Sequence, residues 1–362
     1  MSTATGAPRS DSATPTLSVI VPAYRCAATL REVIAGLEAS SLPRGHWELI
    51  IVDDSSRDET PDVARAHADH VLVTPNGPRG PAFARNLGST VARGDVLVFV
   101  DADVVVAPDT LAQFATLFAS RADTAAAFGA YDLSPRDPGL VSQYRNLLHH
   151  YVHSQNPGDA TTFWAGCGAV RREVFADVGG FDAARYPRPQ IEDIELGYRI
   201  VATGGRILLA PEIQGKHLKR WSFTNMLRTD LRERAIPWMR LLLERKDIAS
   251  DGPLNLRVLE KVLTGLAGAS VLFLVAMLVT GDLRWLFAML GAFVIIVAGN
   301  ASLLLWFVRV RGPLFTAGVI PLRLLFYFTS GFGAAWAIIT HRSQSSHAAR
   351  PALGEGTDHA AA

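Results

Sequence analysis

The segment that most constrains the fold is the apolar run Val96–Val100, which is followed directly by Asp101-Ala102-Asp103. A short run of β-branched and aromatic residues is typical of a buried strand. Carboxylates at the carboxyl end of such a strand lie where an open α/β sheet binds its ligands. Because two carboxylates this close repel each other, a cation is needed beside them. The pair therefore indicates Mg²⁺ or Mn²⁺ bridging to phosphate oxygens, with a plain strand-end turn as the alternative.

Strands and helices are predicted to alternate through the first hundred residues. Strands are expected at Leu17–Val21, Trp47–Val52, Val71–Val73 and Val96–Val100, and helices at Ala27–Ala39, from Ser55 or Ser56 as N-cap to Ala66, and at Ala82–Ala92. Such repeated units predict an α/β fold with a mostly parallel, doubly wound sheet and helices on both faces. No Gly-x-Gly-x-x-Gly fingerprint follows the first strand, which argues against a nicotinamide or flavin site.

Composition and charge exclude several other classes of protein. The chain has 362 residues and a net charge of +1, whereas a nucleic-acid-binding domain normally shows a strong basic excess. Cys26 and Cys167 lack the spacing of a zinc site or a disulfide framework and suit a reducing compartment. Residues 1–16 lack an apolar core and are expected to form a disordered tail rather than a signal peptide, and residues 343–362 a second tail.

Hydrophobic residues, 49% of the chain, concentrate after Leu256 in three long runs. The runs are Val262–Val279, Trp285–Val308 and Leu314–Thr340. Because a helix needs about 20 apolar residues to cross a bilayer, residues 257–342 are expected to form a transmembrane region of about three helices. Pro321 and Arg323 interrupt the third run, which could re-enter instead of spanning. Buried helices of a soluble bundle are the alternative.

Basic residues flank these runs on one side. They are Arg257 and Lys261 before the first run, and Arg309 and Arg311 between the second and third. By the positive-inside rule, we expect a multi-pass protein of the cell (plasma) membrane whose N-terminal domain is cytoplasmic. Three spans would place the chain after Arg342 on the opposite face, and a re-entrant third segment would return it to the cytoplasm.

Four short blocks in the N-terminal part carry a resemblance to a known family. They are Ser18–Tyr24 (SVIVPAY), Ile51–Ser56 (IVDDSS), Ala84–Gly88 (ARNLG) and Val100–Asp103 (VDAD). In this order and spacing they resemble family 2 glycosyltransferases of GT-A fold. The resemblance extends from about Leu17 to Trp221, so residues 17–222 are the expected catalytic domain. It implies an inverting transferase that takes a sugar from a nucleotide-sugar, most often a UDP-sugar, with Mg²⁺ or Mn²⁺ as cofactor.

The resemblance assigns one set of residues to the donor and its metal. The nucleotide-sugar site would comprise Pro22, Tyr24, Asp53, Asp54, Arg85, Asp101 and Arg220, and the metal ligands would be Asp101, Asp103 and His217 with Asp103 as principal ligand. Asp54 would accept the imide N–H of uracil with Asp53 in support, although capping of the next helix by Asp54 is an alternative. Arg79 and Arg85 are candidates for diphosphate or base contacts, and Arg85 could equally form a structural ion pair.

A second set belongs to the acceptor and the catalytic base. The acceptor site would comprise Trp164, Gly166, Cys167, Gly168 and Trp221. The first four lie in Phe163–Ala169, which resembles the Gly-rich segment beside the donor sugar, where glycines allow close backbone approach. Glu192 and Asp193 begin a predicted helix and resemble the family's Glu-Asp pair, in which Asp193 deprotonates the acceptor hydroxyl. An acidic first turn without chemistry is the alternative.

The segment His217–Trp221 resembles the Gln-x-x-Arg-Trp motif of membrane-embedded polysaccharide synthases and lipid glycosyltransferases, with His at the first position. His217 is a candidate third metal ligand. Arg220 could neutralise the leaving diphosphate, and Trp221 could stack on a sugar face. A basic patch before a membrane-surface helix is the alternative.

Residues 223–256 are expected to form amphipathic helices at the membrane interface. Between Asn225 and Asp247, leucines, Trp238 and Met239 are mixed with arginines and a lysine. Such a basic amphipathic stretch, bent at Pro237, is typical of an interfacial segment. It would hold the active site at the bilayer and therefore favours a lipid-borne acceptor. A solvated helix packed on the catalytic domain is the alternative.

The expected reaction is a single in-line displacement at the anomeric carbon, which inverts its configuration. The acceptor is expected to be a hydroxyl or phosphate group, lipid-linked or on a glycan, at the cytoplasmic membrane face in cell-envelope glycan biosynthesis. Membrane lipids would be further partners, and nucleic acid would not. A processive polysaccharide synthase subunit is the alternative within this class. A catalytically silent, membrane-anchored sugar-nucleotide-binding protein is the alternative outside it.

Overall fold

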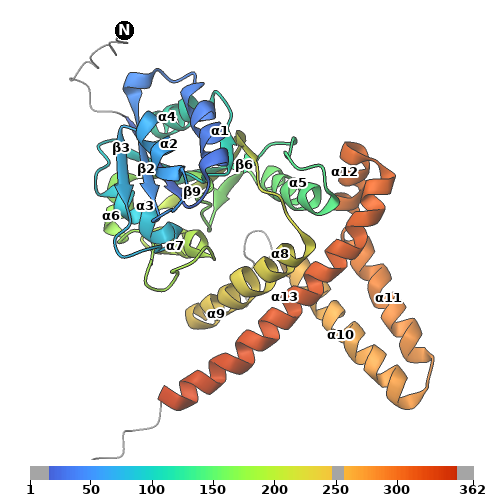
Figure 1. Cartoon of the computed structure of the whole chain (residues 1–362). Helices are drawn as coiled ribbons and strands as arrows, with labels where there is room; N and C mark the ends of the chain where they lie inside the picture. Colours follow the sequence, from blue (N-terminus) through green and yellow to red (C-terminus); the bar gives the residue numbers. More distant parts are fainter. Residues whose placement is uncertain (1–15, 247–256, 349–362) are drawn as a thin grey trace, which may run out of the picture. The chain divides into compact units, whose positions relative to one another are not determined.

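The computed structural model describes residues 16–246 and 257–348, which divide into two compact units (Figure 1). The sheet unit contains residues 16–226, 257 and 303–319, and the helical unit contains residues 227–246, 258–302 and 320–348. The expected tails fall largely outside the described residues, as does 247–256 of the expected amphipathic segment. Residues 303–319 lie within the expected transmembrane region, but they belong to the sheet unit.

A mixed sheet forms the centre of the sheet unit, with strand order β3-β2-β1-β4-β8-β6-β9-β5 and β7 paired to β9. Its strands are β1 (Leu17–Ala23), β2 (Trp47–Asp53), β3 (His70–Val73), β4 (Val96–Val100), β5 (Val104–Val106), β6 (Thr124–Tyr131), β7 (Gly158–Ala160), β8 (Cys167–Arg171) and β9 (Arg206–His217). The first four strands are parallel as predicted, and β6 is parallel to β9. The remaining pairs are antiparallel, so the sheet as a whole is mixed rather than mostly parallel. The difference begins at β8, which runs back along β4.

Helices connect the strands of the sheet unit. They are α1 (Ala27–Glu38), η1 (Arg44–His46), α2 (Thr60–His67), α3 (Pro81–Ser89), α4 (Thr110–Ser120), α5 (Leu140–Ser154), α6 (Arg172–Asp177) and α7 (Glu192–Ala202). The predicted helices α1 and α3 are confirmed to within a few residues. The expected caps of α2 are wrong, because the helix begins only at Thr60. Ser55 has a φ of 59° and donates its hydroxyl to Thr74 O at 2.9 Å, and the Ser56 hydroxyl accepts the Arg25 N–H at 2.9 Å.

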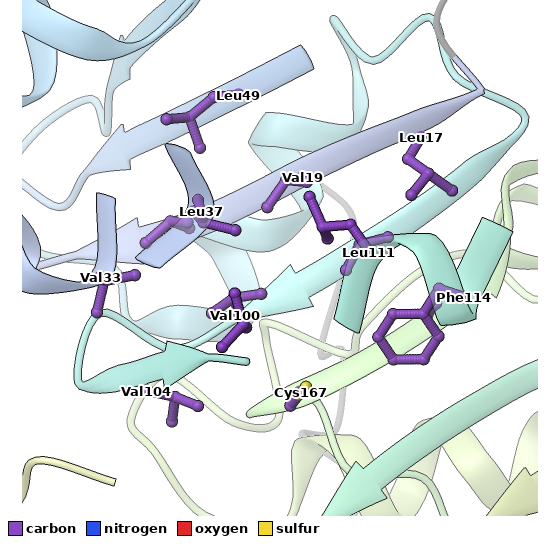
Figure 2. Packing of buried hydrophobic residues seen from close by; sticks show 14 of the residues in the cluster. Leu17, Val19, Val33, Leu37, Leu49, Val100, Val104, Leu111, Phe114 and Cys167 are labelled. Carbon is purple, nitrogen blue, oxygen red and sulfur yellow. The ribbon is translucent and has the colours of Figure 1, made fainter. Parts of the chain in front are cut away.

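Alternate side chains of the parallel strands enter two hydrophobic cores, one on each face of the sheet. Val19 and Val21 of β1 pack with α1 and α4, whereas Ile20 packs on the other face with α3, α6 and α7. Figure 2 shows part of the first core, where Val33 of α1 and Phe114 of α4 lie over the strands. Strands buried on both faces contain near-continuous apolar runs, which is why β1, β2 and β4 were recognisable from sequence.

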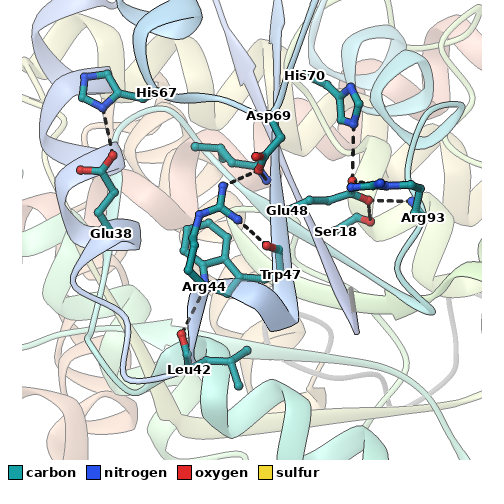
Figure 3. Close-up of polar contacts among 11 residues, drawn as sticks. Ser18, Glu38, Leu42, Arg44, Trp47, Glu48, His67, Asp69, His70 and Arg93 are labelled. Carbon is teal, nitrogen blue, oxygen red and sulfur yellow. Dashed lines mark hydrogen bonds and ion pairs between the residues drawn. The ribbon is translucent and has the colours of Figure 1, made fainter. Parts of the chain in front are cut away.

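The edge where β2 begins is closed by ion pairs and hydrogen bonds within the chain. Glu48 is 2% exposed and accepts hydrogen bonds from Ser18 at 2.6 Å and from the Arg93 side chain at 2.9 Å (Figure 3). Burial alone would raise the pKa of Glu48, but these bonds hold it below its usual value. Figure 3 also shows Arg44 bonded to Asp69. These contacts pair the charges at this edge with one another and thereby stabilise the start of the sheet.

Helices make up the rest of the described chain. They are α8 (Phe223–Arg228), the π-helical turn η2 (Thr229–Ala235), α9 (Ile236–Arg245), α10 (Val258–Thr280), α11 (Arg284–Gly299), α12 (Ala301–Arg311) and α13 (Pro313–Ala348). Segment α8–η2–α9 is helical as predicted for the amphipathic region. Pro237 lies in the first turn of α9, where the missing N–H of a proline is tolerated.

Within residues 16–246 and 257–348, two helices are long and apolar enough to cross a membrane, α10 over Val258–Thr280 and α13 over Pro313–His341. Helices α11 and α12 pass the same test only as a pair, and they meet at 61°. The second predicted run, Trp285–Val308, therefore forms two helices, because the chain bends between Gly299 and Ala301, and the number of spans is three only if this pair crosses as one. The third segment, in contrast, continues through Pro321 as one helix.

A buried polar cluster in the helical unit coincides with this bend. Arg323 of α13 is 6% exposed, and its Nε donates to Asn300 Oδ1 at 2.7 Å. Its Nη2 donates to Glu260 Oε1 of α10 at 2.7 Å and to the Tyr327 hydroxyl at 2.9 Å. Asn300 also donates its Nδ2 to Ile296 O at 2.8 Å. The Asn300 side chain takes the place of its own N–H on Ile296 O, and that N–H bonds to Val297 O instead. Insertion of a side chain into the helical hydrogen-bond ladder is a recognised cause of a kink, and Arg323 holds this side chain at the bend.

Candidate active site

Polar side chains follow the ends of the parallel strands at one edge of the sheet. Tyr24 follows β1, Asp54 follows β2 and Asp101 follows β4. The strand order reverses next to β1, because β2 and β3 lie on one side of it and β4 on the other. Ligands of open α/β sheets bind outside the carboxyl ends of strands at such a reversal. The predicted donor residues of these strands therefore lie at the edge where a nucleotide is expected.

Asp54 is buried and bonded to the loop that follows β3. Its carboxylate accepts hydrogen bonds from Thr74 Oγ1 at 2.8 Å and from the backbone N–H groups of Arg79 and Gly80 at 2.7 and 2.9 Å. The suggestion that Asp54 caps α2 is therefore wrong, because its oxygens face the 74–80 loop. Its assignment to the uracil base stays a prediction, and a base would have to share an oxygen with this loop.

Asp53, Tyr24 and Pro22 lie next to Asp54, at the ends of β2 and β1. Asp53 is 2% exposed and accepts the Ser56 N–H at 3.2 Å from each carboxylate oxygen, which is longer than the bonds to its neighbour. Tyr24 is 43% exposed, with the Arg25 guanidinium 5.1 Å from its ring. Pro22 is half-buried within β1. An exposed aromatic ring next to a buried carboxylate can stack on a base while the carboxylate accepts its N–H.

Arg85 joins the donor side of the site to the predicted base. It is 4% exposed, and its Nη2 donates to Asp101 Oδ1 at 2.6 Å while its Nη1 donates to Glu192 Oε1 at 3.1 Å. Burial would lower the pKa of the Arg85 guanidinium, but the nearby carboxylates raise it above its usual value, so the group stays charged. Of the two interpretations of Arg85, the structure shows the ion pair. Its Nε is buried without a hydrogen-bond partner among the described residues.

Asp193 lies in the first turn of α7, beside the segment predicted to bind the acceptor. Its Oδ2 accepts the Ala165 N–H at 3.2 Å, and its Oδ1 accepts the Ile194 N–H at 2.8 Å. Burial and, to a lesser extent, the charge of Glu192 raise the pKa of Asp193 to about 7, although Arg85 opposes the shift. A carboxyl with a pKa near neutrality is suited to general base catalysis, which an ordinary surface aspartate is not.

The Gly-rich segment turns the chain from α5 and β7 into β8. Gly166 O accepts the Asp101 N–H at 3.2 Å, which holds the segment against the end of β4. A Cβ on Gly166 would lie 2.6 Å from the Trp164 indole, and one on Gly168 would lie 2.3 Å from Trp164 O, so both positions require glycine. Cys167 is fully buried in the first core, and burial raises the pKa of its thiol to about 12. Cys167 therefore contributes no side chain to an acceptor site.

Asp103 and His217 are brought together by the pairing of β5 with β9. Val104 pairs with His217, and the His217 Nε2 lies 3.5 Å from Asp103 Oδ2. Burial would raise the pKa of Asp103, but its contact with His217 holds it below its usual value. Among the described residues, no three His, Cys, Asp or Glu side chains gather as a metal site. Asp101 in particular is bonded to Arg85 instead.

These two side chains nevertheless fit one divalent ion. Two neighbouring ligands, each about 2.1 Å from an octahedral ion, lie about 3 Å apart, which is close to the observed Asp103–His217 separation. Carboxylate and imidazole suit Mn²⁺. The remaining positions of such an ion are commonly filled by water and substrate phosphates.

The structure changes the interpretation of Arg220 and Trp221. The Arg220 side chain is 86% exposed, with Nε 3.6 Å from Asp137 Oδ2. Trp221 is 9% exposed, and its backbone N–H donates to Ser142 Oγ at 2.7 Å. The Arg145 guanidinium lies 5.0 Å from its ring. Trp221 thus anchors its segment to α5, and stacking of its ring on a sugar face is not supported. The diphosphate role of Arg220 stays a prediction.

Two further positions in the site are missed by the sequence interpretation. Asn86 of α3 accepts the Phe181 N–H at 2.9 Å and donates to Phe181 O at 2.7 Å, which ties α3 to the turn before α7. Its place in the ARNLG block could have indicated this role. Helix α5 places His149 4.5 Å from the Trp164 ring. Helix α5 contains no short motif, so its contact with Trp164 depends on packing between segments that are distant in sequence.

Residues 18–179 match the family model described as Glycosyl transferase family 2. Among curated proteins, validoxylamine A glucosyltransferase of Streptomyces hygroscopicus is 28% identical over 246 residues, which cover 58% of this chain and 56% of that protein. Pre-mycofactocin glycosyltransferase of Mycobacterium tuberculosis is 28% identical over 210 residues, covering 54% of this chain and 41% of that protein. The chain thus spans about half the length of the curated relatives that it matches.

Solved structures confirm the GT-A fold. A mannosyltransferase from Pyrobaculum calidifontis, solved with GDP-Man and Mn²⁺, superposes with a TM-score of 0.54 at 19% identity over 90% of this chain and 88% of that chain. Residues 1–349 of TarS from S. aureus, solved with UDP-GlcNAc, superpose with a TM-score of 0.50 at 16% identity over 91% and 92%. At such low identity these similarities establish the fold alone.

Proposed function

We propose that the protein is a metal-dependent, inverting glycosyltransferase that moves a sugar from a nucleotide-sugar, expected to be a UDP-sugar, to a hydroxyl or phosphate acceptor. The observation that carries the proposal is the position of Asp193. This carboxyl of near-neutral pKa lies beside the Trp164–Ala165 segment and is linked through Glu192 and Arg85 to Asp101. Direct transfer between two bound substrates requires the base that activates the acceptor to lie close to the groups that bind the donor, and this network links them.

The donor would bind across the ends of β1, β2 and β4. Asp54 would accept a base N–H, with Asp53 in support, and Tyr24 would border the base. Asp101, held by Arg85 at 2.6 Å, would present its second oxygen to the ribose. This arrangement uses each buried carboxylate for one part of the nucleoside. The GDP-Man and UDP-GlcNAc in the two solved structures support a nucleotide-sugar at this edge.

Asp103 and His217 would hold Mg²⁺ or Mn²⁺, which stabilises the charge on the departing diphosphate. The Mn²⁺ in the Pyrobaculum calidifontis structure supports this cofactor. Asp103 would bind the ion as carboxylate and His217 through Nε2. Arg220 would add its guanidinium to the diphosphate if its exposed side chain leaves Asp137.

Asp193 would remove the proton of the acceptor hydroxyl as the hydroxyl attacks the anomeric carbon. At neutral pH a carboxyl of pKa about 7 is partly ionised, and it is basic enough to accept a proton from the attacking hydroxyl. Glu192, bonded to Arg85 and to the Gln190 N–H, keeps the first turn of α7 in place. Attack from the face opposite the diphosphate inverts the anomeric configuration in one displacement.

A lipid-linked acceptor at the cytoplasmic membrane face is part of the proposal. It is supported by the basic helices α8–α9 and by the apolar helices α10 and α13. Reporter fusions or cysteine labelling at the N-terminus, at Asp282 and beyond Arg342 test the topology. We expect the N-terminus on the cytoplasmic side and Asp282, at the turn between α10 and α11, on the opposite side. An N-terminus outside the cell would overturn the cytoplasmic donor site.

The proposed activity is tested with purified full-length protein in detergent and a panel of nucleotide-sugars. Release of nucleoside diphosphate is measured with and without a lipid extract, and with and without EDTA. We expect Asp193→Asn to lower turnover by about 10²–10⁴-fold, the usual contribution of a general base, with donor affinity nearly unchanged. Glu195→Gln is the matched control on α7, because Glu195 bonds to Arg199 and not to the site.

Two outcomes would contradict the proposal. If no donor is turned over while a donor still binds, the protein is a sugar-nucleotide-binding protein and not a transferase. If Asp193→Asn abolishes donor binding but leaves turnover of bound donor unchanged, Asp193 belongs to the donor site instead of serving as the base.

A further inference from the structure

We propose that Asn146 of α5 is a positioning residue that fixes the tautomer of His217 and so presents its Nε2 to a divalent ion on Asp103. The proposal rests on the proposed function, because it concerns the metal that assists transfer. It adds to the site a residue from a helix that carries no recognisable motif. The evidence is the hydrogen bond between the two side chains, the orientation of the imidazole ring and the burial of the Asn146 amide.

His217 is held on two sides. Its Nδ1 lies 2.6 Å from Asn146 Oδ1, and both residues are buried at 5% and 1% exposed. The Tyr131 ring stacks on the imidazole with centroids 4.4 Å apart and planes 7° apart. The hydrogen bond and the stacked ring together determine the direction of Nε2, which faces Asp103 at 3.5 Å.

The bond to Asn146 decides which ring nitrogen carries the proton. An amide oxygen can only accept, so the Nδ1 of His217 must donate its N–H to Asn146 Oδ1. The neutral ring then has its lone pair on Nε2, which is the form that binds a metal. Ligating histidines generally donate their other N–H to a carbonyl or carboxylate, and loss of that partner usually weakens metal binding.

The side-chain NH₂ group of Asn146 supports the same role in positioning His217. Its Nδ2 is buried without a hydrogen-bond partner among the described residues. A buried amide that satisfies only one of its two polar groups is a poor choice for stability, since a buried donor without a hydrogen bond is destabilising. The bond to His217 is therefore the contact that gives an asparagine an advantage at this position.

The test compares three variants of the full-length protein in detergent, with Mn²⁺ alone as the probe. Asn146→Leu removes the acceptor, Asn146→Asp keeps an acceptor but cannot donate, and His217→Ala removes the ligand. Mn²⁺ affinity is measured by EPR of the free ion, and ¹⁴N coupling from the imidazole is measured by electron spin echo on the bound ion. Gln143→Leu is the matched control one turn earlier on α5, where Gln143 bonds to Asp137 O and Arg311.

We expect ¹⁴N coupling in the wild type and its loss in His217→Ala. Asn146→Leu should bind Mn²⁺ about 10–100-fold more weakly, the usual effect of removing the partner of a ligating histidine. Asn146→Asp should retain both affinity and coupling, and Gln143→Leu should bind as the wild type does. A merely structural role of Asn146 would not be restored by a carboxylate that reproduces only the acceptor.

Three results would overturn the inference: wild-type affinity in Asn146→Leu, failure of Asn146→Asp to bind, or absence of ¹⁴N coupling in the wild-type complex. These results are distinguishable from failure of the proposed function, which is measured by donor turnover. A protein with the expected Mn²⁺ spectra and no turnover would refute the transferase and leave the role of Asn146 intact.

Discussion

Arg85 in the sheet unit and Arg323 in the helical unit are both buried and paired with acidic side chains, but the two clusters differ in charge balance. In the sheet unit, Arg85 bonds to Asp101 and Glu192. In the helical unit, Arg323 bonds to Glu260 and to the neutral groups of Asn300 and Tyr327. The Arg323 cluster therefore pairs one guanidinium with one carboxylate.

The Arg85 cluster contains more negative charge than its guanidinium can neutralise. Asp193 lies in the same electrostatic environment, and burial together with the charge of Glu192 raises its pKa to about 7. A fold selected for stability alone would not bury an extra carboxyl here, whereas a site that must accept a proton benefits from one. The comparison favours the proposed role of the Arg85 cluster in transfer, whereas the Arg323 cluster joins α13 to α10 and to the break at Asn300.

The largest effect is expected from Arg85→Met. Removing one partner of a buried ion pair leaves the other charge uncompensated, which costs about 3–5 kcal/mol of stability. Because Asp101 and Glu192 lose the group that positions them, transfer by the folded protein should also fall by about a hundredfold or more. Thermal unfolding and steady-state turnover of the purified variant measure the two effects.

The control for this variant is Arg31→Met, which removes another arginine–glutamate pair. The Arg31 and Glu59 side chains are 53% and 74% exposed, so their pair should contribute less than about 1 kcal/mol, and turnover should not change. Full turnover in Arg85→Met would show that the ion-pair network plays no part in the reaction.

Arg323→Met should destabilise the helical unit by a similar amount, about 3–5 kcal/mol, but leave turnover per folded molecule unchanged. The double variant Arg323→Met/Glu260→Gln should recover much of the loss, because it removes both charges. Thermal unfolding in detergent measures each variant. No recovery in the double variant would mean that the bonds to Asn300 and Tyr327, rather than the charge pair, stabilise the cluster.

The pH dependence of transfer should report the pKa of Asp193. A base acts when deprotonated, so kcat/KM should fall about tenfold for each pH unit below about 7 and level off above it. Arg85 lowers this pKa, so in Arg85→Met the acidic limb should move to higher pH. The profile is measured at saturating metal ion. If Asp193→Asn retains some activity and the acidic limb of its kcat/KM profile is unchanged, the titrating group is not Asp193.

The parallel half of the sheet could be predicted because its pattern is local. The residues of Val96–Val100 and of β1 are buried on both faces, and the aspartates follow the strands directly in sequence. The second half could not be predicted in this way. Strand β6 is rich in alanine, which is uncommon in strands, and β9 contains Pro211, which argues against a central strand. Their pairing depends on contacts between distant segments.

The same limit applies to the site. The positions of Asp53, Asp103 and Asp193 follow from strand ends and a helix start, so the sequence indicates them. The bond between Asn146 and His217 joins residues 71 positions apart, and no local pattern announces it. Asn300, at the break between α11 and α12, likewise bonds to Arg323, which follows 23 positions later within an apolar run.

The smallest expected effect is on the free energy of unfolding, and its sign should differ between the Arg85 cluster, which includes Asp193, and the Arg323 cluster. The pKa of Asp193 is raised from 3.8 to about 7 on folding, so between these pH values the folded protein binds a proton that the unfolded chain has lost. The contribution of Asp193 to the free energy of unfolding therefore falls as pH rises through this window. Above pH 7 the fold bears the full cost of the ionised carboxylate.

Asp193→Asn removes that cost and should stabilise the protein at pH 8 by on the order of 1 kcal/mol, or about 2–4 °C in Tm, with little effect near pH 4. Glu260→Gln should destabilise at pH 8, because it leaves Arg323 without its counter-charge. Glu195→Gln, on the same helix as Asp193, should give no gain. Thermal unfolding of the three variants at both pH values measures these signs. A loss of stability in Asp193→Asn at pH 8 would mean that its carboxylate is favourable in the fold, and the contrast between the clusters would not hold.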